Sequence, residues 1–229
     1  MTDTPSADDA EIERWVAFDS SAFDRFARIS TGWYWRVVWR LRAHGVEHVP
    51  ARGGVIIAPN HSSYADPFVQ ICPVPRVVRF MAKSSLFEVV GLRRIMRSGG
   101  AFPVRRGESD ARAIEIARRI LARGDALVVY AEGTRYRDSL DLGPSRSGAA
   151  RLALEAGVPI VPVASWGAKR RELYGLGRWQ RRRVTSVYGE PMDFTHLEPT
   201  KENVAHVREA LWARIHELYE QAREIDAAR

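Results

Sequence analysis

Five short and mostly apolar runs limit the folds that are open to this chain. They are Val55–Ala58, Val77–Met81, Ala126–Tyr130, Ile160–Ala164 and Val184–Tyr188. Each run has the length of a strand, and segments with helical spacing lie between them. Strands that carry apolar residues on both faces are typical of a sheet covered by helices on both sides. We therefore predict an α/β fold, with a largely parallel or mixed central sheet flanked by helices.

Three segments have the apolar spacing of core-facing helices. The first is Ala111–Arg123, which Ser109 or Asp110 caps and Gly124 ends. The second is Ala149–Ala156. The third spans about 201–224, and its apolar stripe comprises Val204, Val207, Leu211, Ile215 and Leu218.

The first 44 residues differ from the rest. Residues 1–10 are acidic and polar, and we predict a disordered tail. Residues 11–44 are predicted to form N-terminal helices at a membrane interface, and 45–229 the α/β domain. Residues 32–42 carry three of the seven tryptophans, interleaved with arginines, as in segments that lie at lipid headgroups. The alternative is an aromatic helix docked on the main domain, with its arginines in solvent.

Charge and composition restrict the partners. The chain has 35 Lys and Arg against 28 Asp and Glu, which favours nucleic acid, a phospholipid surface or a phosphate-bearing substrate. It lacks the signatures of common nucleic-acid-binding folds, so we expect no nucleic acid. No apolar run approaches the roughly 20 residues that span a bilayer. With the single Cys72 and no secretory signal, we expect a cytoplasmic protein, peripheral at the inner face of the cell membrane.

A histidine and an aspartate follow the first apolar run. His61 and Asp66 are five residues apart, in a stretch that Asn60 and Pro67 favour as a turn. A carboxylate beside an imidazole fixes its tautomer and stabilises the imidazolium, as general-base catalysis requires. A structural histidine that caps the next helix is the alternative. Ser62 and Ser63 adjoin the histidine, but the Gly-x-Ser-x-Gly motif of many hydrolases is missing.

Three further blocks follow in the chain. The stretch 99–107 combines glycines, for close backbone approach, with arginines suited to phosphate; a surface turn is the alternative. The stretch 130–135 follows an apolar run and suits an anionic group at a strand end, unless a buried Glu–Arg ion pair holds the loop. The stretch 157–163 is a turn into a buried strand. A basic stretch over 169–183 suits lipid or acyl-CoA phosphates, or is a solvated loop.

In this order and spacing, the four blocks resemble those of the glycerolipid acyltransferase family, over about residues 35–195. The resemblance implies that His61 is the general base, that Asp66 orients it, and that Arg106 binds the acceptor phosphate. It implies an acceptor pocket completed by Glu132, Gly133, Thr134 and Arg135. Other possible site residues are Lys83, Gly100, Arg105 and Arg146, the last standing where the family has a lysine.

The resemblance also implies the reaction. A fatty acyl group passes from acyl-CoA or acyl carrier protein to the hydroxyl of a lysophospholipid, 1-acyl-sn-glycerol-3-phosphate giving phosphatidate. No metal and no cofactor beyond that co-substrate is expected, and an anionic membrane surface is the expected site of action. The alternatives are an acyltransferase for a glycolipid or amino-acid lipid, and a non-enzymatic basic protein that binds nucleic acid or membrane.

Overall fold

The computed structural model describes residues 7–17, 32–89, 91–105, 110–136, 140–169 and 183–229. In chain order its elements are α1 (Ala7–Val16), a helix over 32–38, β1 (Arg42–His44), the 3-10 turn η1 (Val46–His48), β2 (Val55–Pro59), α3 (Asp66–Ile71), β3 (Val78–Lys83), the 3-10 turn η2 (Ser84–Phe87), α4 (Leu92–Ser98), β4 (Ala101–Val104), α5 (Ala111–Ala122), β5 (Ala126–Val128), α6 (Gly148–Ala156), β6 (Ile160–Trp166), β7 (Thr185–Tyr188) and α8 (Lys201–Ala227).

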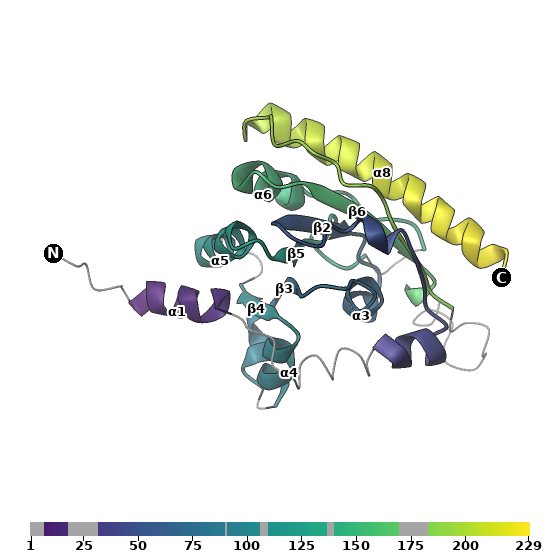
Figure 1. Ribbon diagram of the computed structural model, residues 1–229, viewed down its shortest axis with the longest axis horizontal. Coiled ribbons are helices and arrows are strands. Elements are labelled where there is room, and N and C mark those ends of the chain that lie inside the picture. Colours follow the sequence, from purple (N-terminus) through teal and green to yellow (C-terminus); the bar gives the residue numbers. More distant parts are fainter. Residues whose placement is uncertain (1–6, 18–31, 90, 106–109, 137–139, 170–182) are drawn as a thin grey trace.

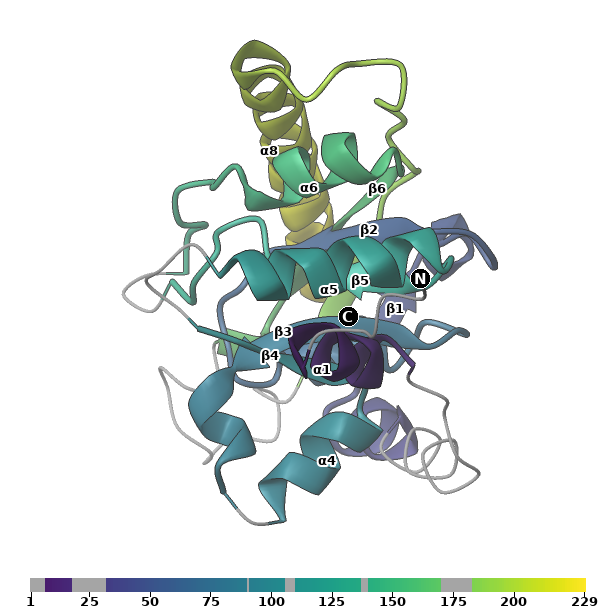
Figure 2. The same cartoon turned by 90° about the vertical axis from the view of Figure 1, so that its left-hand side faces the viewer.

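The seven strands form one mixed sheet in the order β1-β7-β6-β2-β5-β3-β4. Neighbouring strands are parallel, except that β6 and β7 are antiparallel. Helices α5, α6 and α8 lie on one side of the sheet, and α3, α4 and the helix over 32–38 lie on the other (Figures 1 and 2). The predicted α/β class is confirmed.

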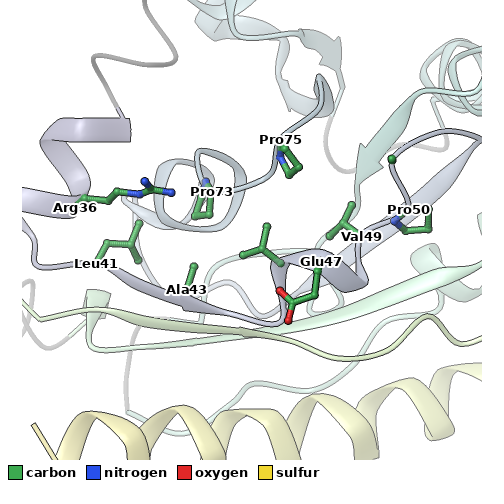
Figure 3. Close-up of a pocket in the computed structure, with 10 residues that line it drawn as sticks. Arg36, Leu41, Ala43, Glu47, Val49, Pro50, Pro73 and Pro75 are labelled. Carbon is green, nitrogen blue, oxygen red and sulfur yellow. The ribbon is translucent and has the colours of Figure 1, made fainter.

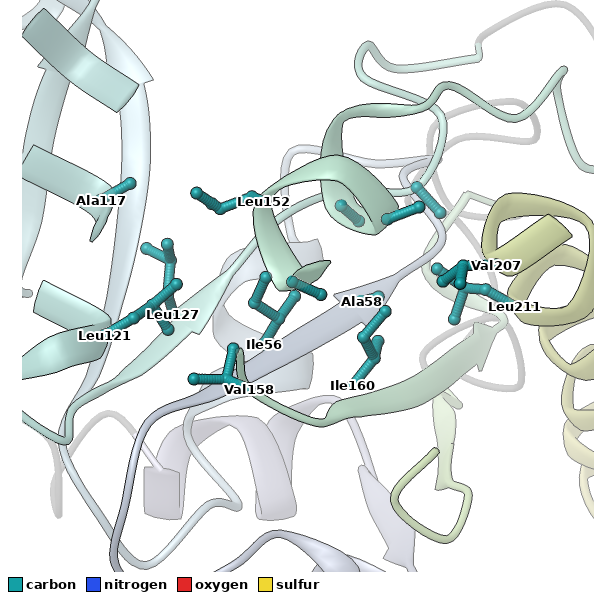
Figure 4. Close-up of a cluster of buried hydrophobic side chains, with 14 of the residues drawn as sticks. Ile56, Ala58, Ala117, Leu121, Leu127, Leu152, Val158, Ile160, Val207 and Leu211 are labelled. Carbon is teal, nitrogen blue, oxygen red and sulfur yellow. The ribbon is translucent and has the colours of Figure 1, made fainter. Parts of the chain in front are cut away.

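The largest apolar core lies between the sheet and α5, α6 and α8 (Figure 4). Ile56 and Ile160 point from neighbouring strands into this layer, while Ile57 and Val161 belong to a second cluster. All four side chains are completely buried, and each contributes roughly 1.5–3 kcal/mol relative to an exposed side chain. Burial on both faces explains why these strands are apolar throughout.

The predicted disorder of residues 1–10 is wrong from Ala7 onward, because α1 begins there; residues 1–6 lie outside the described part. Helix α1 packs against α5, with Ile12 and Val16 buried. The buried guanidinium of Arg79 donates hydrogen bonds to the carbonyls of Trp15 and Val16 at the end of α1. These contacts order an acidic stretch whose composition alone indicates a tail.

Helix α1 also forms ion pairs with α5. Glu11 lies 2.7 Å from Arg112, and Glu13 lies 2.7 Å from Arg119. Asp9, inside the stretch predicted to be disordered, lies 3.4 Å from Arg119 and so pairs with the same basic helix face. Helix α1 is consequently docked on the main domain.

The helix over 32–38 is docked on the main domain by one side and exposed on the other. Trp35 and Trp39 are buried against α3, and the Trp35 ring stacks on Phe68 at 5.2 Å. Trp33 and Val37 face outward, 65% and 49% exposed. Among the described residues, no helix is both long and apolar enough to cross a membrane.

Two short edge strands were not predicted. Strand β1 lies inside the segment 11–44 that was predicted to be helical, and β4 lies inside the glycine- and arginine-containing block. Three or four residues give too short a pattern to identify a strand. Pro103 is tolerated in β4 because β4 is the last strand of the sheet and needs no further hydrogen-bonding partner.

Candidate active site

Three neighbouring parallel strands bring the candidate residues to one edge of the sheet. His61 follows β2, Glu132 follows β5, and Lys83 ends β3. Because β2, β5 and β3 are adjacent and parallel, their carboxyl ends meet at this edge, where open α/β sheets bind ligands.

The turn after β2 brings His61 and Asp66 together. His61 Nδ1 lies 3.1 Å from Asp66 Oδ2, as the sequence predicted. The main-chain N–H groups of Ser62 and Ser63 donate to the same oxygen at 2.6 and 2.7 Å. An ionised carboxylate only accepts, so the proton lies on Nδ1 and Nε2 keeps its lone pair.

The His61 imidazole is almost enclosed. His61 is 6% exposed and Asp66 is completely buried. The ring stacks on Tyr130 with centroids 3.8 Å apart and planes inclined by 17°. An aromatic face attracts a cation, so the Tyr130 ring would stabilise a protonated His61 imidazole.

Asn60 anchors the start of this turn to the sheet. Its Oδ1 accepts from the Ser165 N–H at 2.8 Å, and its Nδ2 donates to the Ser165 carbonyl at 3.3 Å. Gln70 Nε2 donates to the Asn60 carbonyl at 3.0 Å. The Asn60 side chain thus continues the β2–β6 pairing one residue past the end of β2.

Glu132 supports the turn from the neighbouring strand. Its Oε2 accepts the His61 main-chain N–H at 3.1 Å, and its Oε1 accepts the Gly143 N–H at 3.1 Å. Glu132 is 3% exposed, and burial raises its pKa to about 7, against the opposing effect of both N–H donors. These contacts are those of a positioning residue, whereas the sequence predicted an acceptor ligand.

The other main-chain group of His61 is also held. The His61 carbonyl accepts the Tyr136 N–H at 3.0 Å, and Lys169 Nζ donates to the Tyr136 carbonyl at 2.7 Å. Lys169 is 4% exposed, although the sequence placed it at the start of a basic surface stretch. Residues 170–182 of that stretch lie outside the described residues.

The loop after β5 presents a cation beside the histidine turn. The Arg135 guanidinium lies 3.4 Å from the centre of the Tyr64 ring, and Tyr64 is 67% exposed. Thr134 is exposed, and Gly133 adopts a left-handed φ of 67°. A Cβ on Gly133 would lie 3.2 Å from Cγ of Arg146, so the Arg146 side chain passes beside this loop.

Lys83 and the described residues of the block 99–107 do not gather at the histidine. Lys83 and Arg105 are exposed at the carboxyl ends of β3 and β4, two and three strands away from β2. Gly100 precedes β4 and lies at the opposite edge, where its carbonyl accepts from Arg79 Nε at 2.9 Å; its predicted place in the site is wrong. Arg106 lies outside the described residues.

A cavity of about 640 Å³ lies beside β1 (Figure 3). It extends from Leu41, just before β1, to Pro50 and Pro75, which precede β2 and β3, and none of the predicted site residues that the structure describes lines it. Within the described ranges, no three His, Cys, Asp or Glu side chains form a cluster that could hold a metal ion.

Four residues of the site had no predicted role. Asn60, Tyr64 and Tyr130 adjoin predicted site residues, and Gly143 lies ten positions after Gly133. Of these four residues, Asn60 alone has a local sequence signal, because it stands directly before a histidine at the end of a strand. The stacking of Tyr130 on His61 depends on the pairing of β2 with β5, and Gly143 lies so close to Tyr136 that a Cβ would be 2.8 Å from that ring.

Comparisons with known proteins point in one direction. The acyltransferase family model matches residues 40–166. The 1-acyl-sn-glycerol-3-phosphate acyltransferase of Bacillus subtilis is 31% identical over 183 residues, which cover 78% of this chain and 87% of that protein. The enzyme of the same name from Streptococcus pneumoniae is 27% identical, over 72% of this chain and 60% of its own length.

A solved structure shares the fold. The crystal structure of the 1-acyl-sn-glycerophosphate acyltransferase PlsC from Thermotoga maritima superposes with a TM-score of 0.62 and 22% identity. The match covers 91% of this chain and 87% of that one.

Proposed function

Since this chain belongs to the acyltransferase family, we propose that it transfers a fatty acyl group from a thioester donor to the free hydroxyl of 1-acyl-sn-glycerol-3-phosphate. The product is phosphatidate. The names of the two bacterial relatives support the acceptor. The donor is acyl-CoA or acyl carrier protein.

The observation that carries the proposal is the hydrogen bond between His61 Nδ1 and Asp66 Oδ2. It leaves Nε2 as the basic nitrogen of the imidazole. Nε2 accepts the acceptor's hydroxyl proton while the oxygen attacks the thioester carbonyl carbon. The tetrahedral intermediate collapses as the C–S bond breaks, and the leaving thiolate takes the proton back from His61. Asp66 stabilises the imidazolium between these two transfers.

The acceptor's phosphate is assigned to the loop after β5. Arg135 offers a guanidinium beside the histidine turn, and its forked N–H donors suit a phosphate group. Thr134 and Arg146 flank it, and Arg106 remains a predicted phosphate ligand. Lys83 and Arg105 are farther along the same edge and suit the more distant phosphates of a CoA donor.

We place the enzyme at an anionic membrane, peripheral at its inner face. The outward-facing Trp33, Tyr34 and Val37 on the helix over 32–38 support this location, with Arg36 exposed among them. Tryptophan and arginine suit the headgroup region.

The test is a thiol-release assay with a matched pair of acceptors. Purified protein is given one acyl-CoA and either 1-acylglycerol-3-phosphate or the monoacylglycerol that lacks only the phosphate. We expect release with the first and little with the second. The same acyl chain on acyl carrier protein identifies the donor. Release that is independent of an acceptor, or faster transfer to a glycolipid or amino-acid lipid, would overturn the proposal.

The Tyr64–Arg135 stack gives a specific expectation for the acceptor. Replacing Tyr64 by alanine should raise KM for the phosphate acceptor about two- to fivefold, because an exposed cation–π contact contributes roughly 0.5–1 kcal/mol. The value of kcat should stay near that of the wild type. Steady-state kinetics of Tyr64→Ala and Tyr64→Phe check this, since the phenylalanine variant keeps the ring; an unchanged KM in Tyr64→Ala would count against the stack.

A further inference from the structure

A cluster of arginines lies on the side of the molecule opposite α5, α6 and α8. Arg93, Arg94 and Arg97 line a hollow of about 480 Å³ together with Glu88 and Ser98. The hollow carries three positive charges against one negative charge, and all three arginines are exposed. Guanidinium groups gathered in this way suit phosphate oxygens.

Two of the three arginines are held by the protein. Arg93 Nε donates to the Phe87 carbonyl at 2.7 Å, and the Arg97 guanidinium lies 5.0 Å from the centre of the Trp15 ring. Helix α4 is thereby fixed to η2 and to α1. The arginine cluster therefore has a defined place on the fold.

Exposed apolar side chains surround the arginines. Ile95 is 68% exposed, Val89 is 55% exposed and Leu86 is 37% exposed. Large apolar side chains beside cations are the chemistry of a surface that meets lipid headgroups and the acyl chains below them. We call Leu86, Val89, Arg93, Arg94, Ile95 and Arg97 the α4 patch.

The position of the α4 patch on the molecule also fits a surface that meets lipid headgroups. Helix α4 and the helix over 32–38 lie at the same lower side of the molecule in both views (Figures 1 and 2). The patch begins just after the carboxyl end of β3, and α4 then runs back toward Gly100 and the amino end of β4. A flat bilayer on this side of the molecule can therefore contact both regions.

We propose that the α4 patch binds the phosphate headgroups of an anionic lipid bilayer, as a second contact beside the helix over 32–38. The arginines bind the phosphates, and Ile95 and Val89 enter the interface. Two separated contacts fix the tilt of the molecule on the membrane. The proposal goes beyond the acyl transfer and rests on it only for the presence of a lipid substrate.

The test measures partition of the full chain onto vesicles of phosphatidylcholine, with and without phosphatidylglycerol. The test variant is Arg94→Gln with Ile95→Ser, which spares the held Arg93 and Arg97. Its matched control is Arg151→Gln with Ile114→Ser, exposed residues on the opposite side. We expect the test variant to partition roughly tenfold more weakly onto the anionic vesicles, and the control to behave like the wild type.

Each single change, Arg94→Gln and Ile95→Ser, should reproduce part of the loss, and thermal unfolding should match the wild type. Wild-type partition by the double variant overturns the proposal, as does an equal loss on both kinds of vesicle. A third outcome also overturns it: the double variant binds vesicles like the wild type but turns over more slowly when the donor is acyl carrier protein. That result would mean that the patch binds an acidic protein. Turnover of a short-chain, monodisperse acceptor should stay unchanged; it tests the acyl transfer separately.

Discussion

Replacing His61 by alanine is expected to lower kcat by roughly 10²–10⁴-fold, the usual contribution of a general base. The acceptor hydroxyl then has no positioned base while it attacks the thioester. The fold should persist, because Asp66 keeps the N–H donors of Ser62 and Ser63. Thiol release at saturating acceptor measures the effect, and circular dichroism checks the fold.

Ser62→Ala is the matched control for this variant. It removes the hydroxyl next to the histidine but keeps the main-chain donor to Asp66. Its turnover should stay within a few fold of the wild type. Near-normal turnover in His61→Ala would refute the proton transfer, and a loss confined to Ser62→Ala would indicate a serine nucleophile.

The second large effect is expected at Glu132. Glu132→Ala leaves the buried N–H groups of His61 and Gly143 without their carboxylate acceptor, and each such loss costs about 1–3 kcal/mol. We expect the free energy of unfolding to fall by the cost of one or both of these losses. Because the turn that carries the imidazole is loosened, kcat should fall about 10- to 100-fold, the scale of a misplaced catalytic group.

The pH dependence of the free energy of unfolding tests the contribution of Glu132 to stability separately from its effect on kcat. Its pKa is raised from 4.5 to about 7, so below pH 4.5 the group is neutral in both the folded and the unfolded chain. Between pH 4.5 and 7 the unfolded chain releases this proton while the folded chain keeps it, so the free energy of unfolding falls over that range, by an amount on the order of 3 kcal/mol, and levels off above pH 7.

Glu132→Gln removes this titration. Urea unfolding between pH 5 and 8 should show a smaller decline for Glu132→Gln than for the wild type. Because Gln retains one carbonyl acceptor, its kcat should exceed that of Glu132→Ala. Parallel pH profiles for the wild type and Glu132→Gln, or equal kcat in the two variants, would contradict the positioning role.

Much of the fold followed from local patterns. The strands β2, β5 and β6 were predicted because they are apolar on both faces, and α5 because Asp110 caps it; the structure confirms the cap, since Asp110 Oδ1 accepts the Ala113 N–H at 3.1 Å. The pairing of His61 with Asp66 was also predicted, because the turn residues lie in the same short segment.

What the sequence did not predict depends on contacts between distant segments. Helix α1 is ordered by Arg79 and by α5, more than 60 residues away along the chain. The resemblance placed Glu132 in the acceptor pocket; its contact with the His61 N–H arises because β2 pairs with β5, which brings the ends of the two strands together. Residues at the ends of β3 and β4 were grouped with His61 by order in the chain, which does not fix their distance across a sheet.

The Asn60–Ser165 pairing has a consequence for heat resistance. It anchors the segment just before the imidazole to the strand ladder at the centre of the molecule. That ladder separates only when the whole domain melts, so catalytic loss on warming should track the global transition. The enzyme should therefore show no inactive yet folded intermediate below its melting temperature.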